Sequence, residues 1–135
     1  MNKVFALLCL ALLVCSACKR ETKHEKFHQD FLQFTQKECP KQMDPYTRLD
    51  SVVYNIETRT LTEYYTVSDK LDDDSIYADG KIMSSFRETM LKGLKSSILL
   101  KQYKDEGITF RYEYRSITTG KVKLEISFTK EDYEN

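Results

Sequence analysis

Two runs of alternating side chains near the C-terminus constrain the fold of this chain more than any other feature. Every second residue in each run is apolar, and the residues between them are polar. The apolar residues are Ile108, Phe110, Tyr112 and Tyr114 in the first run and Val122, Leu124, Ile126 and Phe128 in the second. A strand with one buried face has this period of two. The pattern predicts a β-hairpin whose strands are joined through residues 116–120.

The charged residues of this hairpin suggest its register. We expect Tyr114 opposite Val122, Tyr112 opposite Leu124 and Phe110 opposite Ile126 on the buried face, with Glu113 opposite Lys123 and Arg111 opposite Glu125 on the wet face. Opposite charges across strands contribute roughly a few tenths of a kcal/mol per pair. A slip of one residue would turn the apolar set toward water, so the alternation excludes it.

A helix is predicted at 23–38, at the start of the folded region. Phe27, Phe31 and Phe34 recur there at helical spacing, as on one face of a helix. Pro40 cannot continue the helix, because proline lacks the backbone N–H and clashes with the preceding turn. Residues 39–48 then form a turn-rich stretch.

Two further strands and a second helix are predicted between this helix and the last hairpin. The segments 49–56 and 61–67 are rich in Val, Ile, Tyr and Thr, which favour strands. The acidic connection at 68–80 can supply a helix N-cap. The second helix is expected from its apolar stripe, which consists of Ile82, Met83, Phe86, Met90, Leu91, Leu94 and Ile98. Gly93 lowers its helix propensity by about 1 kcal/mol relative to Ala, and the stripe outweighs that cost.

The order of these elements predicts the fold class. We expect an α+β fold with the order α-β-β-α-β-β, in which a four-stranded antiparallel sheet has two helices packed on one face. A single domain would occupy 27–130, and 131–135 would be a frayed tail. We see no residue-by-residue repeat between the two halves.

The N-terminal residues have the organisation of a signal peptide. Lys3 precedes an apolar run at 4–14, and Ser16 and Ala17 supply the small residues that a signal peptidase requires. The uncharged stretch at 4–18 would cover roughly 22 Å as a helix, which is short for a hydrocarbon core of about 30 Å. We therefore predict that residues 1–17 are removed.

The residue after the expected cleavage point is Cys18. This end of the run resembles the lipobox of bacterial lipoproteins, in which small residues precede a Cys that becomes acylated, although Cys15 stands where Leu is usual. The resemblance implies a lipid-carrying Cys18, a polar tether at 18–26 and a protein held at a membrane of the cell envelope, on its periplasmic or cell-surface side. Two or more acyl chains give stable anchoring. The alternative is an ordinary secretory signal cut after Ala17.

The composition of the mature chain narrows its function. Removal of 17 residues from 135 leaves 118, which suits one domain, with 20 basic and 21 acidic residues and a net charge of −1. That balance gives no electrostatic reason to expect nucleic-acid binding. With Cys18 acylated, Cys39 is the lone remaining thiol, so no disulfide forms within one mature chain. We expect Cys39 to be buried as a small apolar residue, with pairing to another molecule as the alternative.

Residues 44–52 contain the pattern T-x-L-D-S-V, and residues 107–114 contain the pattern G-x-T-x-x-Y-x-Y. In these two stretches the chain resembles small secreted proteins and lipoproteins common in Bacteroides-like bacteria. The likeness covers about residues 27–130. That family has no assigned activity, so the resemblance implies a fold and a location outside the cytoplasm and no reaction.

One motif is typical of zinc peptidases. His24, Glu25 and His28 match H-E-x-x-H, which on a helix puts both imidazoles on one face and the Glu beside a metal-bound water. A catalytic zinc needs a third protein ligand, and the chain has no other His. Since the apolar stripe begins at Phe27, we expect His24 and Glu25 to belong to an exposed first turn. We favour a polar helix start, with a small zinc hydrolase as the alternative.

Other sequence features give no catalytic site. The acidic run Asp72, Asp73 and Asp74 does not fit an EF-hand loop, because Tyr77 and Met83 stand where that loop needs Gly and Glu. We expect a solvated, helix-capping loop there. No G-x-S-x-G motif or glycine-rich phosphate loop occurs. One set of lysines indicates a solvated face and a helix end, and it consists of Lys92, Lys95, Lys101 and Lys104.

Tyrosine is frequent, with nine residues in the chain. Those on predicted strands are Tyr54, Tyr64, Tyr65, Tyr112 and Tyr114. Exposed tyrosines suit recognition of a protein partner, whereas strands and cores also use the ring. We therefore expect a non-catalytic binding or interaction module with no cofactor and no metal, anchored to a membrane through Cys18. The alternatives are the zinc hydrolase and an inhibitor or immunity-type protein that blocks an envelope enzyme.

Overall fold

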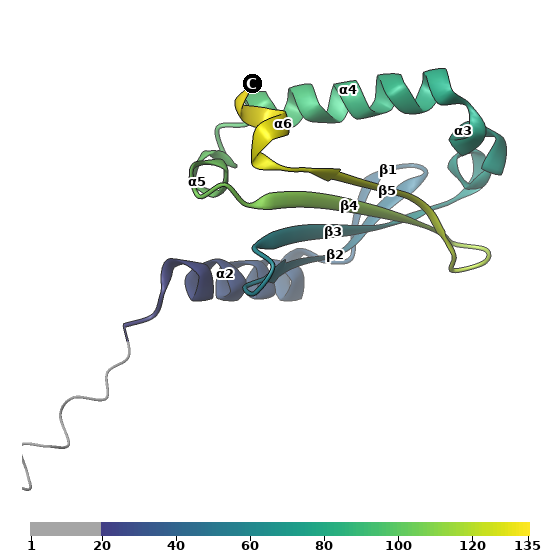
Figure 1. Ribbon diagram of the computed structural model, residues 1–135. Helices are drawn as coiled ribbons and strands as arrows, with labels where there is room; N and C mark the ends of the chain where they lie inside the picture. The colour runs from purple at the N-terminus through teal and green to yellow at the C-terminus, as the bar shows by residue number, and fades with distance from the viewer. Residues whose placement is uncertain (1–19) are drawn as a thin grey trace, which may run out of the picture.

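The computed structural model describes residues 20–135, which form a five-stranded sheet with helices around it (Figure 1). The strands lie in the order of the sequence. They are β1 (Lys41–Asp44), β2 (Thr47–Asn55), β3 (Thr60–Val67), β4 (Thr109–Ser116) and β5 (Val122–Phe128). The helices are α2 (Lys23–Glu38), α3 (Asp74–Ala78), α4 (Gly80–Ser96), α5 (Lys101–Asp105) and α6 (Lys130–Glu134), with a 3-10 turn η1 at Asp69–Asp72.

The predicted α+β class, the helix at 23–38 and both hairpins are confirmed. The sheet differs from the expectation in two ways. A fifth strand, β1, forms inside the turn-rich stretch at 39–48 and pairs with β2. Strands β3 and β4 are parallel, because the connection that contains α3, α4 and α5 carries the chain back to the end of the sheet where β3 begins.

The predicted register of the last hairpin is wrong by two residues. Tyr112 lies opposite Ile126 and Phe110 opposite Phe128, with a bulge between Tyr114 and Arg115. A two-residue shift keeps every side chain on its face, so the alternation alone does not distinguish the two registers. The expected pairing of Glu113 with Lys123 is therefore absent.

Arginine side chains hold the charged face of this hairpin together in the observed register. Glu113 stands opposite Glu125, and Arg111 donates hydrogen bonds to both carboxylates. Arg115 donates a further bond of 2.6 Å to Glu113. The guanidinium groups thus offset the repulsion between two facing carboxylates, and Lys123 is free to bond elsewhere.

The core lies between the other face of the sheet and the helices. Phe110, Phe128, Leu61 and Ile108 are almost fully buried there. Phe27 of α2 and Tyr103 of α5 pack against each other in the same cluster, with ring centroids 4.7 Å apart. One core therefore connects α2, α5 and the three central strands.

Helix α2 runs beside β2, at the lower edge of the sheet in Figure 1. The Thr35 hydroxyl accepts a hydrogen bond from the Val52 N–H and donates one to the Val52 carbonyl, both at 2.8 Å. His28 Nδ1 lies 2.8 Å from the Tyr54 carbonyl oxygen. These backbone groups belong to the part of β2 beyond its pairing with β1. Side chains of α2 therefore pair with a strand edge that would otherwise attract other strands.

Two predicted boundaries need correction. Helix α4 ends at Ser96, so Ile98 does not continue its apolar stripe and is exposed. Residues 131–135 are not a frayed tail, because α6 forms there and buries Tyr133. The Tyr133 hydroxyl donates a 2.9 Å hydrogen bond to the Ile108 carbonyl, and this bond fastens the C-terminal helix to the core.

We expect two glycine substitutions to have opposite effects. Gly93 lies inside α4 with nothing within 4 Å of an added Cβ, so Gly93→Ala should raise the free energy of unfolding by about 0.5–1 kcal/mol. Gly107 has φ +66°, and an added Cβ would lie 3.0 Å from Lys130 Cδ. Gly107→Ala should therefore destabilise the fold by about 1–2 kcal/mol. Urea unfolding of both variants checks the two signs, and equal effects would contradict the account.

Candidate binding pocket

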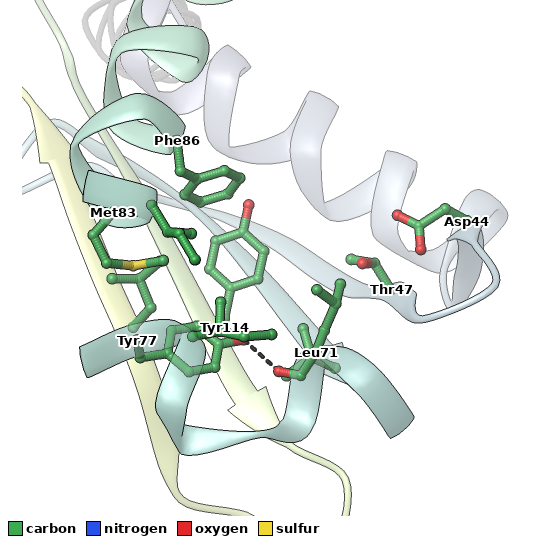
Figure 2. A pocket seen from close by; sticks show the side chains of 11 residues that line it. Asp44, Thr47, Leu71, Tyr77, Met83, Phe86 and Tyr114 are labelled. Carbon is green, nitrogen blue, oxygen red and sulfur yellow. Dashed lines mark hydrogen bonds between the residues drawn. The ribbon is translucent and has the colours of Figure 1, made fainter. Parts of the chain in front are cut away.

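A pocket of about 290 Å³ opens at the end of the sheet where β3 and β4 finish (Figure 2). Its walls come from the ends of β1, β3 and β4, the starts of β2 and β5, the η1–α3 corner and the first turns of α4. The residues that line it are Asp44, Thr47, Val67, Leu71, Ile76, Tyr77, Ile82, Met83, Phe86, Tyr114 and Leu124. The lining is predominantly apolar, so the pocket can bury an apolar group.

The η1–α3 corner forms one wall because its acidic residues cap the helices. The Asp73 carboxylate accepts the Ser75 N–H at the start of α3. The Asp79 carboxylate accepts two N–H groups at the start of α4, at 2.9 and 3.1 Å. The Tyr77 hydroxyl donates a 2.6 Å bond to the Leu71 carbonyl, shown as the dashed line in Figure 2. The prediction of a helix-capping acidic loop is confirmed.

Asp72 has a role that the sequence did not suggest. Its carboxylate accepts hydrogen bonds from the hydroxyls of Ser116 at the end of β4 and Thr118 in the β4–β5 turn. Lys123 Nζ lies 3.4 Å from its other oxygen. These bonds lower the pKa of Asp72 to about 2, with the Ser116 bond as the largest cause. Asp72 therefore ties the corner beside the pocket to the last hairpin.

Aromatic rings form the floor beside the pocket. Tyr65 and Tyr114 stack with their centroids 4.8 Å apart, and Phe86 of α4 packs at 5.8 Å against Tyr114. Figure 2 shows the Tyr114 ring directly below Phe86, with Thr47 of β2 farther to the right. Burial raises the pKa of Tyr65 and Tyr114, and the nearby Glu63 carboxylate raises both further. Both hydroxyls therefore stay protonated at neutral pH.

Glu63 is a largely enclosed carboxyl group next to this floor. The Tyr65 hydroxyl donates a hydrogen bond to it. Burial raises the pKa of Glu63, and the Tyr65 bond offsets part of that rise. It also lines a second hollow together with Tyr112 and residues of α4 and the loop after it, namely Met90, Gly93, Leu94, Ser97 and Leu100.

The raised pKa of Glu63 predicts a pH-dependent stability. The folded protein binds a proton on the Glu63 carboxyl more tightly than the unfolded chain does. The stabilisation that this proton gives to the fold is therefore complete at pH values below the pKa of Glu63 in the unfolded chain. It is lost as the pH rises through the pKa of Glu63 in the folded protein. Glu63→Gln removes the buried charge and keeps an acceptor for Tyr65. We expect the variant to be more stable than the native chain at pH 8, on the order of 1 kcal/mol, with a smaller difference at pH 4. A difference independent of pH in urea unfolding would contradict this.

The H-E-x-x-H residues all have structural partners in this fold. His24 Nδ1 lies 2.7 Å from the Tyr54 hydroxyl, and His28 Nδ1 faces the Tyr54 carbonyl. Glu25 forms a capping box with Thr22 at the start of α2. Across residues 20–135, no group of three or more His, Cys, Asp or Glu side chains could hold a metal ion. These bonds explain the motif as a helix start fastened to β2.

The other predicted site residues lie apart from the pocket. Cys18 is outside the described residues, so its acylation stays a prediction. Cys39 is half-buried against the core, and burial raises the pKa of its thiol. Lys104 donates to the carbonyls of Leu94 and Lys95 at the end of α4, as a helix-end lysine should.

The tyrosines divide between the core and the pocket. Tyr54 is fully buried, whereas Tyr114 lines the pocket and Tyr112 lines the second hollow. No helix in the part of the chain that the structure describes combines the length and apolarity of a membrane span.

Comparison with known proteins gives a family and a fold. The model of a family described as Domain of unknown function (DUF8479) matches residues 22–124. This agrees with the expectation of a family without an assigned activity. No curated protein matches the sequence.

Three solved structures share the fold. A Pseudomonas aeruginosa protein described as secreted has a TM-score of 0.67 at 12% identity, covering 87% of this chain and 99% of its own. EpsS, a pilotin from the Vibrio vulnificus type 2 secretion system, has a TM-score of 0.61 at 10% identity. The match covers 85% of this chain and 96% of EpsS. AspS, the type II secretion system pilotin from Vibrio cholerae, has a TM-score of 0.57 at 14% identity. The match covers 83% of this chain and 94% of AspS. At these identities the likeness concerns the fold.

Proposed function

Since the chain belongs to the DUF8479 family, whose description names no activity, we propose a function from its own residues. We propose that the protein is a lipid-anchored, non-catalytic binding module of the cell envelope that holds an apolar segment of a partner protein. The observation that carries this proposal is the apolar pocket between the η1–α3 corner, α4 and the sheet.

The size and lining of the pocket favour side chains of a protein segment as its occupant. Its volume of about 290 Å³ lies just below the range of about 300–1,000 Å³ usual for small-molecule sites. One or two large apolar side chains would suit that space. Ile82 at its mouth is 46% exposed, and Met83 and Phe86 are only half-buried. Covering them would gain about 25 cal/mol for each Å² of apolar surface removed from water.

Acidic residues at the rim favour a partner segment with basic residues beside its apolar ones. Asp44 lies at the mouth, is exposed, and makes no ion pair among residues 20–135. Asp73 and Asp79 hold further negative charge on the corner that forms the opposite wall. A Lys or Arg next to the inserted side chain would meet this charge.

Anchoring through Cys18 supports the same function. The chain between Cys18 and Lys23 spans at most about 18 Å when extended, so the domain would stay close to the lipid surface. Two of the proteins that share the fold are pilotins of type II secretion systems, which is consistent with a place in the envelope. An inhibitor or immunity-type role is the special case in which the partner is an enzyme.

Site-specific photocrosslinking in cells tests the binding proposal. We would replace Met83 in the pocket with a photoreactive residue in the full chain, and Val53 on the charged face as the matched control. Val53 is 44% exposed and Met83 is half-buried at the pocket, so a partner can reach both positions. We expect one stoichiometric adduct from position 83 and none from position 53.

The identity of the crosslinked segment decides the proposal. It should be apolar with flanking Lys or Arg, and a peptide of that sequence should bind the purified protein about tenfold more weakly after Asp44→Lys. Equal labelling from both positions would refute the pocket as the binding site, and an acidic segment crosslinked from position 83 would refute the proposed basic partner. The mass of the mature N-terminus tests the anchor separately, because Cys18→Ser should remove the acyl chains and release the protein from the membrane fraction.

A further inference from the structure

The loop between α4 and α5 exposes two adjacent large aliphatic side chains. Ile98 is 86% exposed and Leu99 is 88% exposed, far more than any other large apolar residue of the described chain. Scattered single apolar residues on a surface are normal. Here two neighbours at a loop tip are both exposed, and burying each of them would contribute roughly 1.5–3 kcal/mol of free energy. An apolar environment outside the domain would recover this burial, which the domain itself does not provide.

Bonds on both sides hold the loop in this conformation. Lys104 Nζ donates to the Leu94 and Lys95 carbonyls at 2.9 and 2.7 Å, and the Lys101 N–H donates to the Ile98 carbonyl at 3.1 Å. Leu100 packs against the core. The two exposed side chains are therefore presented by an anchored loop.

The loop lies at the end of the domain from which the N-terminal chain departs. Lys23, the first residue of α2, forms an ion pair with Glu106, which follows α5 directly. His24 Nε2 lies 4.0 Å from the same carboxylate. Figure 1 shows α5 and the chain before α2 at the same end of the molecule. A bilayer reached by Cys18 would also be within reach of this loop.

The residues around the tip suit a lipid surface. From Lys92 to Lys104 the sequence contains four lysines and no acidic residue. Lys104 caps the end of α4 and Lys101 pairs with Asp105 at the surface, so the exposed lysines beside the tip are Lys92, Lys95 and Lys101. Lysine stems can lie along an apolar surface while their ammonium groups remain among polar headgroups. An aliphatic tip between such lysines fits the boundary between headgroups and acyl chains.

We propose that Ile98 and Leu99 insert into the bilayer surface as a second membrane contact, beside the lipid on Cys18. This proposal rests on the proposed anchoring. The contact would orient the domain, because the pocket lies at the other end of α4. A helix of 17 residues is about 25 Å long, so the pocket would face away from the membrane, open to a partner.

Tryptophan fluorescence provides a direct test, because the chain contains no Trp. We would introduce Leu99→Trp into the full, lipidated chain and use Ile117→Trp as the matched control. Ile117 is 56% exposed in the β4–β5 turn, away from α5. The protein would be reconstituted in vesicles of phosphatidylcholine and phosphatidylglycerol with acyl chains brominated in half of the samples.

We expect blue-shifted emission and quenching by brominated lipid for Leu99→Trp only. If both variants float with the vesicles but show equal, unshifted emission, the loop proposal is overturned and the anchor is left intact. If the lipidated chain does not float, the anchor has failed, and the Cys18→Ser chain carrying Leu99→Trp is titrated with the same vesicles. A shift in that titration, weakened about tenfold by Ile98→Ser, supports insertion, and no shift overturns it.

Discussion

We expect Phe110→Ala to lower the free energy of unfolding by about 3–5 kcal/mol, measured by urea denaturation. Phe110 is 1% exposed and lies in the middle of the sheet, opposite Leu61 of β3 and Phe128 of β5. Its ring also packs edge-on at 5.6 Å against Tyr133 of α6. Truncation removes buried apolar surface and leaves a cavity that three elements cannot collapse around. Since domains of this size have only about 5–15 kcal/mol in total, the variant should be marginally folded.

A control separates this packing effect from a general loss of strand propensity. Val53→Ala also removes a strand-favouring side chain, but from a position on the charged face that is 44% exposed. We expect it to cost less than about 1 kcal/mol. Similar losses for the two variants would mean that Phe110 is not a central packing residue, and that α6 is not part of the cooperative core.

Local periodicity explains why most elements were predictable. The helix at 23–38 shows three phenylalanines at helical spacing before Pro40, and the last hairpin shows two alternating runs. Such patterns depend on which side of an element is buried, and they do not depend on the identity of its partner. They therefore determine the faces of β4 and β5 while leaving the register open to a shift of two residues.

Features that depend on distant parts of the chain were not predictable in this way. The parallel pairing of β3 with β4 follows from where α5 ends, more than 40 residues after β3 begins. Ile98 fits the helical stripe by its spacing, but Lys104 caps the carbonyls of α4 before that residue. Helix α6 starts at a local capping box of Thr129 and Asp132, but the bond from Tyr133 to the Ile108 carbonyl that fastens it to the core joins distant parts of the chain.

The candidate pocket shows the same limit for function. Its lining joins Thr47, Val67, Tyr114 and Leu124, which are dispersed over nearly 80 residues of sequence. The sequence instead suggested the compact H-E-x-x-H motif, whose residues are engaged with Thr22 and Tyr54. The only sequence signals for the pocket were the abundance of strand tyrosines and the acidic loop, and neither indicates a cavity by itself.

The pairing of α2 with the edge of β2 predicts a second large effect, for Thr35→Val. Valine has nearly the same shape as threonine but no hydroxyl, so the Val52 N–H and carbonyl both lose their partner. An unpaired, partly buried backbone group costs about 1–3 kcal/mol, so we expect a loss of about 2–4 kcal/mol. The Val52 amide should also exchange its hydrogen faster, which NMR hydrogen exchange would detect.

Thr35→Ser is the matched control, because it keeps the hydroxyl and removes only a methyl group. We expect it to cost less than about 1 kcal/mol and to leave the exchange of the Val52 amide nearly unchanged. The exposed edge in Thr35→Val should also increase self-association with protein concentration, since an unpaired strand edge recruits other strands. Equal losses for Val and Ser would show that packing of α2, and not the two hydrogen bonds to Val52, holds this helix against the sheet.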